Sequence, residues 1–282
     1  MKLAGFFFLA VLYASPAVAA ESKLSIEQPT LHQSEDGPPV PASFQFVPGD
    51  LVYFSCQFGG YQKVEKENKE IIHLTYSIEV RDQQGVLLVP AEADKIQTDV
   101  AAEDRNWMPK VRFSFSIPSF VDSGEYEILV KVKDESSAAE ASARARFTIL
   151  GKNVASSDKL VVRNFRFLRS EDDQDPLSVR AYRPGDAVWA RFEMTGYRLG
   201  EKNELDIEYG LTVLRPTGEA TYSQPNAAEE KTATFYPQRY TPGVLSLNLP
   251  KDLKLGEYTI VLAVRDNLGG QTYETKEKFS VE

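Results

Sequence analysis

The chain has little cysteine, histidine or basic charge for its size. Its 282 residues include one cysteine and two histidines. Cys56, His32 and His73 are too few and too scattered to supply the three or four ligands of a zinc site, and a single thiol cannot form an intrachain disulfide. With 32 Lys+Arg against 41 Asp+Glu, the formal net charge is −9, which disfavours nucleic acid as a partner because an acidic chain repels phosphates.

Catalytic signatures are also absent from the sequence. It contains no G-x-S-x-G elbow, no H-E-x-x-H pair and no P-loop. The acidic residues are scattered, so no carboxylate pair for glycoside hydrolysis stands out. We therefore predict no catalytic residue and no cofactor, and a non-enzymatic protein.

A long apolar run occurs only at the N-terminus. Lys2 precedes the almost wholly apolar stretch from Leu3 to Leu12, and Ala17-Val18-Ala19 supplies small residues for cleavage. This pattern predicts a cleaved signal peptide over residues 1–20 and a secreted or periplasmic protein, with an uncleaved anchor as the alternative. No later stretch approaches about 18 apolar residues, so we expect no membrane span in the mature chain.

The chain contains an internal duplication. Pro48-Gly49-Asp50 reappears as Pro184-Gly185-Asp186, and Gly124-Glu125-Tyr126 reappears as Gly256-Glu257-Tyr258. Further matches follow in the same order with two short gaps, which indicates two homologous domains. We predict domains at 21–150 and 159–282, joined by the small, polar linker 151–158.

Each copy alternates apolar and polar residues with a period of two. Val52, Phe54, Cys56 and Phe58 share one face, and their counterparts in the second copy are Val188, Ala190, Phe192 and Met194. Short alternating segments between Pro- and Gly-containing turns are typical of strands with one buried face. The fold class predicted is all-β, with two tandem immunoglobulin-like antiparallel β-sandwiches. Cys56, Phe192, Ile128 and Ile260 are expected inside.

Two motifs resemble the immunoglobulin fold. The tract from Gly49 to Cys56 resembles its second strand, and Asp122-Ser123-Gly124-Glu125-Tyr126 resembles the D-x-G-x-Y motif that opens its sixth strand. The resemblance implies that the Tyr126 hydroxyl bonds to nearby backbone. Ile128 stands at the partner-cysteine position, so the inter-sheet disulfide of that family is absent.

The second copy also resembles macroglobulin-type domains of bacterial envelope proteins. The tract from Tyr182 to Val188 carries this resemblance, together with the later Leu-x-Leu-Pro and Gly-Glu-Tyr motifs. Such domains are immunoglobulin-like sandwiches too. A sandwich hosts many functions, so the resemblance implies the fold more than the activity.

Two loops are candidate binding features. Asn106 to Pro109 and Phe235 to Tyr240 occupy corresponding places before the fifth strand of each copy. Their residues Trp107, Tyr236, Arg239 and Tyr240 suit protein or sugar recognition, and they equally suit packing over the edge of the sandwich.

The densest acidic cluster runs from Glu171 to Asp175. Its oxygens could bind Ca²⁺, but the run lacks the full pattern of a calcium loop, and we favour a solvated loop without metal.

The sequence thus predicts an exported, non-enzymatic interaction module of the cell envelope with a protein or glycan partner. A structural spacer of an envelope assembly and a calcium-dependent adhesion protein are the alternatives.

Overall fold

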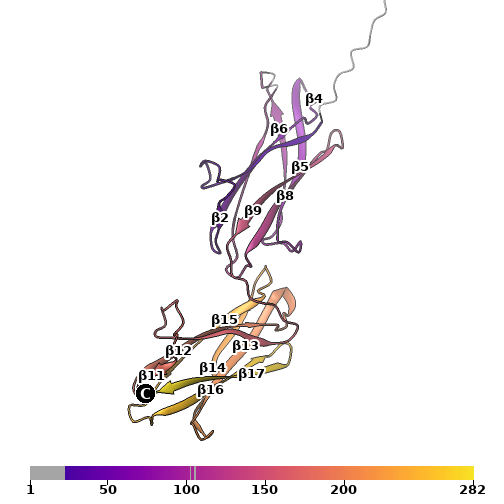
Figure 1. Ribbon diagram of the computed structural model, residues 1–282. Helices are drawn as coiled ribbons and strands as arrows, with labels where there is room; N and C mark the ends of the chain where they lie inside the picture. Colours follow the sequence, from indigo (N-terminus) through magenta and orange to yellow (C-terminus); the bar gives the residue numbers. More distant parts are fainter. Residues whose placement is uncertain (1–22, 102, 105) are drawn as a thin grey trace, which may run out of the picture.

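The structure is a computed structural model, which describes residues 23–101, 103–104 and 106–282. The predicted signal peptide, residues 1–20, lies outside the described residues. Figure 1 shows two β-sandwiches stacked end to end, which we call the first sandwich (residues 25–149) and the second sandwich (residues 161–281). Within the described residues, no helix is long and apolar enough to cross a membrane.

The first sandwich packs a small sheet, β1-β3-β7, against a larger one, β2-β9-β8-β5-β4, in which β6 also pairs with β5. Its strands are β1 (Ser25–His32), β2 (Gln45–Phe46), β3 (Leu51–Gly59), β4 (Val64–Lys66), β5 (Lys69–Arg81), β6 (Glu92–Val100), β7 (Lys110–Ser116), β8 (Gly124–Asp134) and β9 (Glu140–Ile149).

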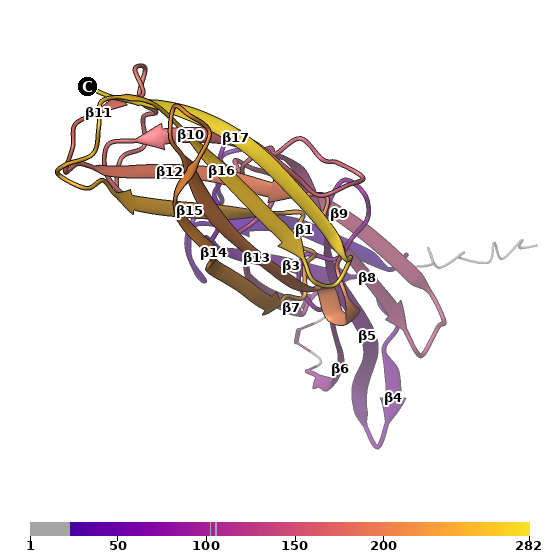
Figure 2. The same cartoon turned by 90° about the horizontal axis from the view of Figure 1, so that it is seen from below.

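The second sandwich repeats this plan, with the small sheet β10-β12-β15 against β11-β17-β16-β13-β14 (Figure 2). Its elements are β10 (Val161–Leu168), β11 (Ala181–Tyr182), β12 (Ala187–Thr195), the 3-10 turn η1 (Glu201–Asn203), β13 (Glu204–Leu214), β14 (Ala220–Ala233), β15 (Tyr240–Asn248), β16 (Gly256–Asp266) and β17 (Gln271–Val281). The predicted all-β fold is therefore confirmed. Two short pairs, β2 with β9 and β11 with β17, are parallel rather than antiparallel.

The duplication extends to backbone irregularities. The first strand of each sandwich carries a bulge at the same place, where Gln28 and its counterpart Asn164 both have a φ of 50°. Both sandwiches also have the same strand order in their small sheets. The two copies therefore share the topology of the small sheet, and the first sandwich has the additional strand β4 in its large sheet.

The predicted register of the core is confirmed. Cys56 and its counterpart Phe192 are buried, as are Ile128 and its counterpart Ile260. Each residue lies on an inward face because side chains alternate across a strand. The inter-sheet disulfide position is thus filled by apolar packing in both sandwiches.

The immunoglobulin-like hydrogen bond predicted for the corner tyrosine is present twice. The Tyr126 hydroxyl donates to the carbonyl of Asp122 at 2.9 Å, and the Tyr258 hydroxyl donates to the carbonyl of Lys254 at 2.8 Å. Each bond fixes the turn before its strand to the strand itself. The resemblance to the immunoglobulin fold therefore holds in the structure as well as in the sequence.

Candidate functional site at the domain junction

The structure separates the four candidate loop residues into two places. Trp107 lies in the loop before β7, and 40% of its surface is exposed. Strand β7 runs from that loop towards residues 118–122, so its length separates Trp107 from the second sandwich. Tyr236, Arg239 and Tyr240 lie instead where the two sandwiches meet.

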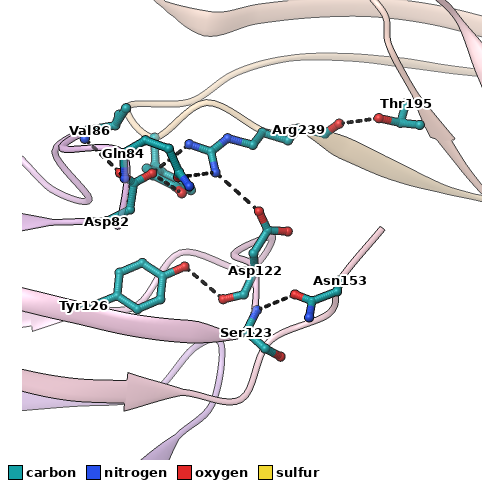
Figure 3. Close-up of polar contacts among 10 residues, drawn as sticks. Asp82, Gln84, Val86, Asp122, Ser123, Tyr126, Asn153, Thr195 and Arg239 are labelled. Carbon is teal, nitrogen blue, oxygen red and sulfur yellow. Dashed lines mark hydrogen bonds and ion pairs between the residues drawn. The ribbon is translucent and has the colours of Figure 1, made fainter. Parts of the chain in front are cut away.

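The junction is built around one carboxylate of the first sandwich. Asp82 Oδ2 accepts hydrogen bonds from Arg239 Nη2 at 2.7 Å and from the Tyr236 hydroxyl at 2.9 Å. The other arm of the guanidinium donates to Gln84 Oε1 at 3.1 Å and to Asp122 Oδ2 at 3.3 Å (Figure 3). Arg239 therefore binds three side chains of the other sandwich through its fixed fork of donors.

Hydrogen bonds within its own turn orient the Asp82 side chain towards the second sandwich. The residue ends the β5 strand pattern and opens the turn Asp82-Gln83-Gln84-Gly85, in which Gly85 adopts a φ of 81°. Asp82 Oδ1 accepts the backbone N–H of Gln84 at 2.9 Å and that of Val86 at 2.8 Å. One carboxylate oxygen thus holds the turn, and the other is left to face the second sandwich.

Burial and hydrogen bonds set the charge state of this contact. Burial opposes ionisation of Asp82, but the Val86 N–H, the Tyr236 hydroxyl and the Arg239 guanidinium together hold the pKa of its carboxyl below the ordinary value. Burial, and then the bond to Asp82, raise the pKa of Tyr236. Asp82 is therefore ionised and Tyr236 a protonated donor at neutral pH.

The aromatic side chains of the same loop fill the rest of the contact. Tyr236 is buried among the core residues of the first sandwich, although it belongs to the second half of the chain. Tyr240 packs edge-on against Phe120 of the first sandwich, with ring centroids 5.7 Å apart. The Arg239 guanidinium lies 5.6 Å from the centre of the Tyr236 ring. The two sandwiches thus share apolar surface around the ion pair.

The linker adds a second polar contact. The Lys152 N–H donates to the carbonyl of Val121, and the Lys152 ammonium binds the carboxylate of Glu193 on β12. Arg166 Nη1 also donates to that carboxylate, at 3.3 Å. Glu193 is only 1% exposed, so the linker and Arg166 cover it. Lys152 therefore connects the backbone of the first sandwich to a buried charge of the second.

The start of the linker is pressed against the first sandwich. A Cβ atom built on Gly151 would collide with the carbonyl of Val121, so only glycine fits this close approach. Ser123 Oγ donates to the carbonyl of Gly151 at 2.8 Å, and the Ser123 N–H donates to Asn153 Oδ1 at 2.9 Å. The first residues of the predicted linker are consequently held in place.

Sequence reasoning identified one side of this junction and missed the other. Tyr236, Arg239 and Tyr240 were candidates because aromatic residues and arginine stand together in one loop. Asp82 stands in a glycine-containing turn of the sequence, and no motif marks Glu193 as a buried charge. Alternation along the strand places Glu193 on the face opposite Phe192, so its burial is visible only in the structure.

The first sandwich also contains a histidine–serine contact. His32 Nε2 lies 2.9 Å from Ser55 Oγ, and His32 Nδ1 lies 3.0 Å from the carbonyl of Gly37. Ser55 is buried, so its hydroxyl is closed to a substrate. We interpret the contact as a clasp that holds the loop after β1 onto the small sheet.

Cys56 is expected to be chemically inert in the folded protein. Its side chain is 1% exposed, and burial raises the pKa of its thiol to about 12. Since the thiolate is the reactive form, labelling by a thiol reagent at pH 8 should proceed only as fast as the protein opens. Ellman's reagent should detect no thiol within minutes in buffer and one thiol per chain in 6 M guanidinium. Rapid labelling of the native protein would contradict the buried position.

The acidic loop shows no assembled metal site. Among the described residues, no group of three or more His, Cys, Asp or Glu side chains is placed to hold a metal ion. The Arg191 guanidinium donates to the backbone carbonyls of Glu171 and Asp173. These two oxygens therefore face a positive side chain of the protein. We therefore keep the expectation that the loop is solvated.

Calcium should leave the stability of the mature chain unchanged. A site in the native state would raise the unfolding temperature with ion concentration, whereas a solvated loop would not. The unfolding temperature in EDTA and in millimolar Ca²⁺ should agree within about 1 °C. A rise of several degrees that disappears in the variants Asp173→Asn and Asp175→Asn would establish a calcium site.

Comparison with known proteins gives distant structural likenesses. No protein-family model and no curated protein matches the sequence. The C-terminal domain of the antigen I/II polypeptide BspA of Streptococcus agalactiae is 10% identical, with a TM-score of 0.32, over 92% of this chain and 100% of that one. The C-terminal domain of the antigen I/II-family protein AspA of Streptococcus pyogenes is 9% identical, with a TM-score of 0.30, over 93% of this chain and 100% of that one.

Red sea bream transglutaminase is 11% identical, with a TM-score of 0.27, and the match covers 94% of this chain and 32% of that one. Scores at this level establish neither a common family nor a common activity. The resemblance to macroglobulin-type domains therefore stays a prediction, and the fold rests on the strands described above.

Proposed function

We propose that the protein is an exported, non-enzymatic interaction module of the cell envelope, in which two immunoglobulin-like sandwiches act as one rigid unit. The observation that supports this most is the buried contact of Asp82 with Arg239 and Tyr236. Its two donors come from one loop and its acceptor from a turn of the other sandwich. Such a contact fixes the angle between the sandwiches, so surfaces on both can meet one partner together.

The same junction supports the spacer alternative. A spacer needs a stiff connection between its domains. The loop around Arg239 forms such a connection, so its residues are not free to bind a partner. What favours an interaction module is aromatic surface that the junction leaves uncovered. Trp107 is 40% exposed and Phe235 is 51% exposed, and accessible aromatic rings are common contact residues for protein and sugar partners. The partner class proposed is a protein or a glycan. The calcium-adhesion alternative has less support, because Arg191 engages the carbonyls of the acidic loop.

Affinity capture from envelope extracts tests this proposal. The mature chain, residues 21–282, is immobilised and washed, and bound material is competed off with the free chain. The variant in which Trp107 and Phe235 are both replaced by alanine serves as the control, since both rings are exposed. A module should retain a partner that the control retains less. A spacer should retain nothing that the free chain competes off.

N-terminal sequencing tests the proposed export. Protein recovered outside the cytoplasm should begin near Ala20 or Glu21 if the signal peptide is cleaved as the sequence predicts. An intact Met1 on membrane-bound protein would favour the uncleaved anchor.

A further inference from the structure

A second feature of the junction is an open cleft between the sandwiches. It encloses about 370 Å³, a size suited to a small ligand or a few side chains. The first sandwich contributes apolar residues from two loops, and the second contributes the end of β14 and the loop that follows it. The lining includes Leu88, Val89, Glu230, Thr232, Phe235 and Gln238.

The cleft exists because the small sheet is narrower than the sheet that it covers. Strand β14 is at the edge of its sheet, and the facing sheet has only the strands β10, β12 and β15 in the described structure. Glu230 pairs with Ile207, and Thr232 pairs with Leu205. Cross-strand partners point to the same face, so the side chains of Glu230 and Thr232 lie on the face that carries buried Ile207 and Leu205. The end of β14 thus presents its inward face to the cleft instead of to a strand.

One polar group in the cleft is unmatched. Gln238 is 3% exposed, yet its side-chain amide forms no hydrogen bond with the described part of the chain. Its backbone is fixed, since its carbonyl accepts the Tyr197 hydroxyl at 2.7 Å. The amide borders the cleft, where a ligand could meet both its donor and its acceptor.

The free edge of β14 and the residues at the rim of the cleft indicate which class of ligand would fit. Among the described strands, β14 pairs with β13 alone, so its second edge offers free N–H and C=O groups. Glu230 is exposed and has no ion pair with a described residue, and Phe235 is exposed at the rim. The Phe235 carbonyl is anchored by Asn203 Nδ2 at 2.6 Å. The site therefore combines a strand edge, an apolar recess, a free amide and a negative charge.

We propose that this cleft binds an extended polypeptide segment of a partner protein. The segment pairs with the free edge of β14 near residues 228–233. It places an aromatic or large aliphatic side chain between the apolar loops and brings a basic side chain to Glu230. A strand edge favours polypeptide over glycan, because only a peptide backbone matches its alternating donors and acceptors. The inference rests on the proposed function and specifies its partner class and site.

Methyl-labelled mature chain titrated with blocked hexapeptides tests the site. The peptides differ in one central pair, Phe-Arg, Phe-Glu or Ala-Arg, and chitotriose serves as a glycan probe. The Phe-Arg peptide should shift the methyl signals of Leu88 and Val89 and bind more tightly than the other two. Gln238→Leu should weaken its binding about tenfold, the loss expected for a buried hydrogen bond. Glu230→Gln should remove the preference for Arg over Glu.

Matched variants separate failure of the site from failure of the fold. Gln97→Leu makes the same chemical change at an exposed position of β6 and should leave binding unchanged. Glu230→Gln alters an exposed residue, so it remains informative if Gln238→Leu does not fold. The proposal is wrong if no peptide shifts Leu88 and Val89, if chitotriose alone does so, or if Gln238→Leu and Glu230→Gln bind like the wild type. Envelope capture that persists in these variants would leave the interaction module standing and overturn only this site.

Discussion

Replacing Phe192 by alanine should lower the free energy of unfolding of the second sandwich by about 3–5 kcal/mol. The ring is fully buried, stacks on Phe165 at 5.9 Å and meets Tyr209 edge-on at 5.2 Å. A Cβ built on Gly243, across the sheet, would collide with the same ring, so the backbone packs directly against it. Alanine would therefore leave a cavity that its neighbours cannot easily fill.

Urea unfolding of the mature chain, followed by tryptophan fluorescence, measures this effect. Trp189 reports on the second sandwich and Trp107 on the first. The matched control is Cys56→Ala, which removes one atom at the equivalent position of the first sandwich and should cost far less. A loss below about 1 kcal/mol for Phe192→Ala would contradict the packing described here.

Replacing Asp82 by asparagine should uncouple the sandwiches and lower the free energy of their joint unfolding by about 1–3 kcal/mol. Asparagine keeps an oxygen for the N–H groups of Gln84 and Val86, so the turn is retained. It removes the charge that holds Arg239, whose side chain is 34% exposed and keeps some access to water. The expected loss is for this reason smaller than for a fully buried ion pair.

Two transitions in calorimetry where the wild type shows one would demonstrate the uncoupling. Arg215→Ala is the matched control, because Arg215 opens the corresponding turn of the second sandwich, away from the junction. Unchanged cooperativity in Asp82→Asn would mean that the ion pair does not join the sandwiches.

Acid should weaken the junction in the same way. The pKa of the Asp82 carboxyl is lower in the folded chain than its unfolded value of about 3.9. Its contribution to stability is therefore complete above that value and is lost as the pH falls through the lower, folded pKa. The coupling should persist from neutral pH down to about pH 4 and disappear below it.

The sequence was sufficient to predict the sandwiches but insufficient to predict how they meet. Alternation along a strand determines which residues face inward. The same alternation occurs in both copies at equivalent positions, so Cys56 and Phe192 could each be placed in the core from the sequence. The Tyr126 corner bond spans only four residues, so a local motif could predict it. All of these features depend on local sequence or on repetition.

The junction depends on residues far apart in the chain. Asp82 and Arg239 are 157 positions apart in the chain. Each stands in a loop that, from the sequence alone, could equally lie in solvent. Their counterparts in the repeat are Arg215 in place of Asp82 and Trp107 in place of Arg239. The repeat therefore has no equivalent ion pair, and comparing the two copies could not predict the contact. The cleft beside β14 depends in turn on this contact, because its walls come from both sandwiches.

The distance distribution between spin labels on the two sandwiches tests the central claim, that they form one rigid unit, most directly. Labels at Lys131→Cys on β8 and Lys276→Cys on β17 occupy exposed strand positions, while buried Cys56 should escape modification. The account predicts one narrow distribution at neutral pH, broadened by Asp82→Asn and by Arg239→Ala but not by Arg215→Ala. A broad distribution in the wild-type chain, or one that the junction variants leave unchanged, would contradict it.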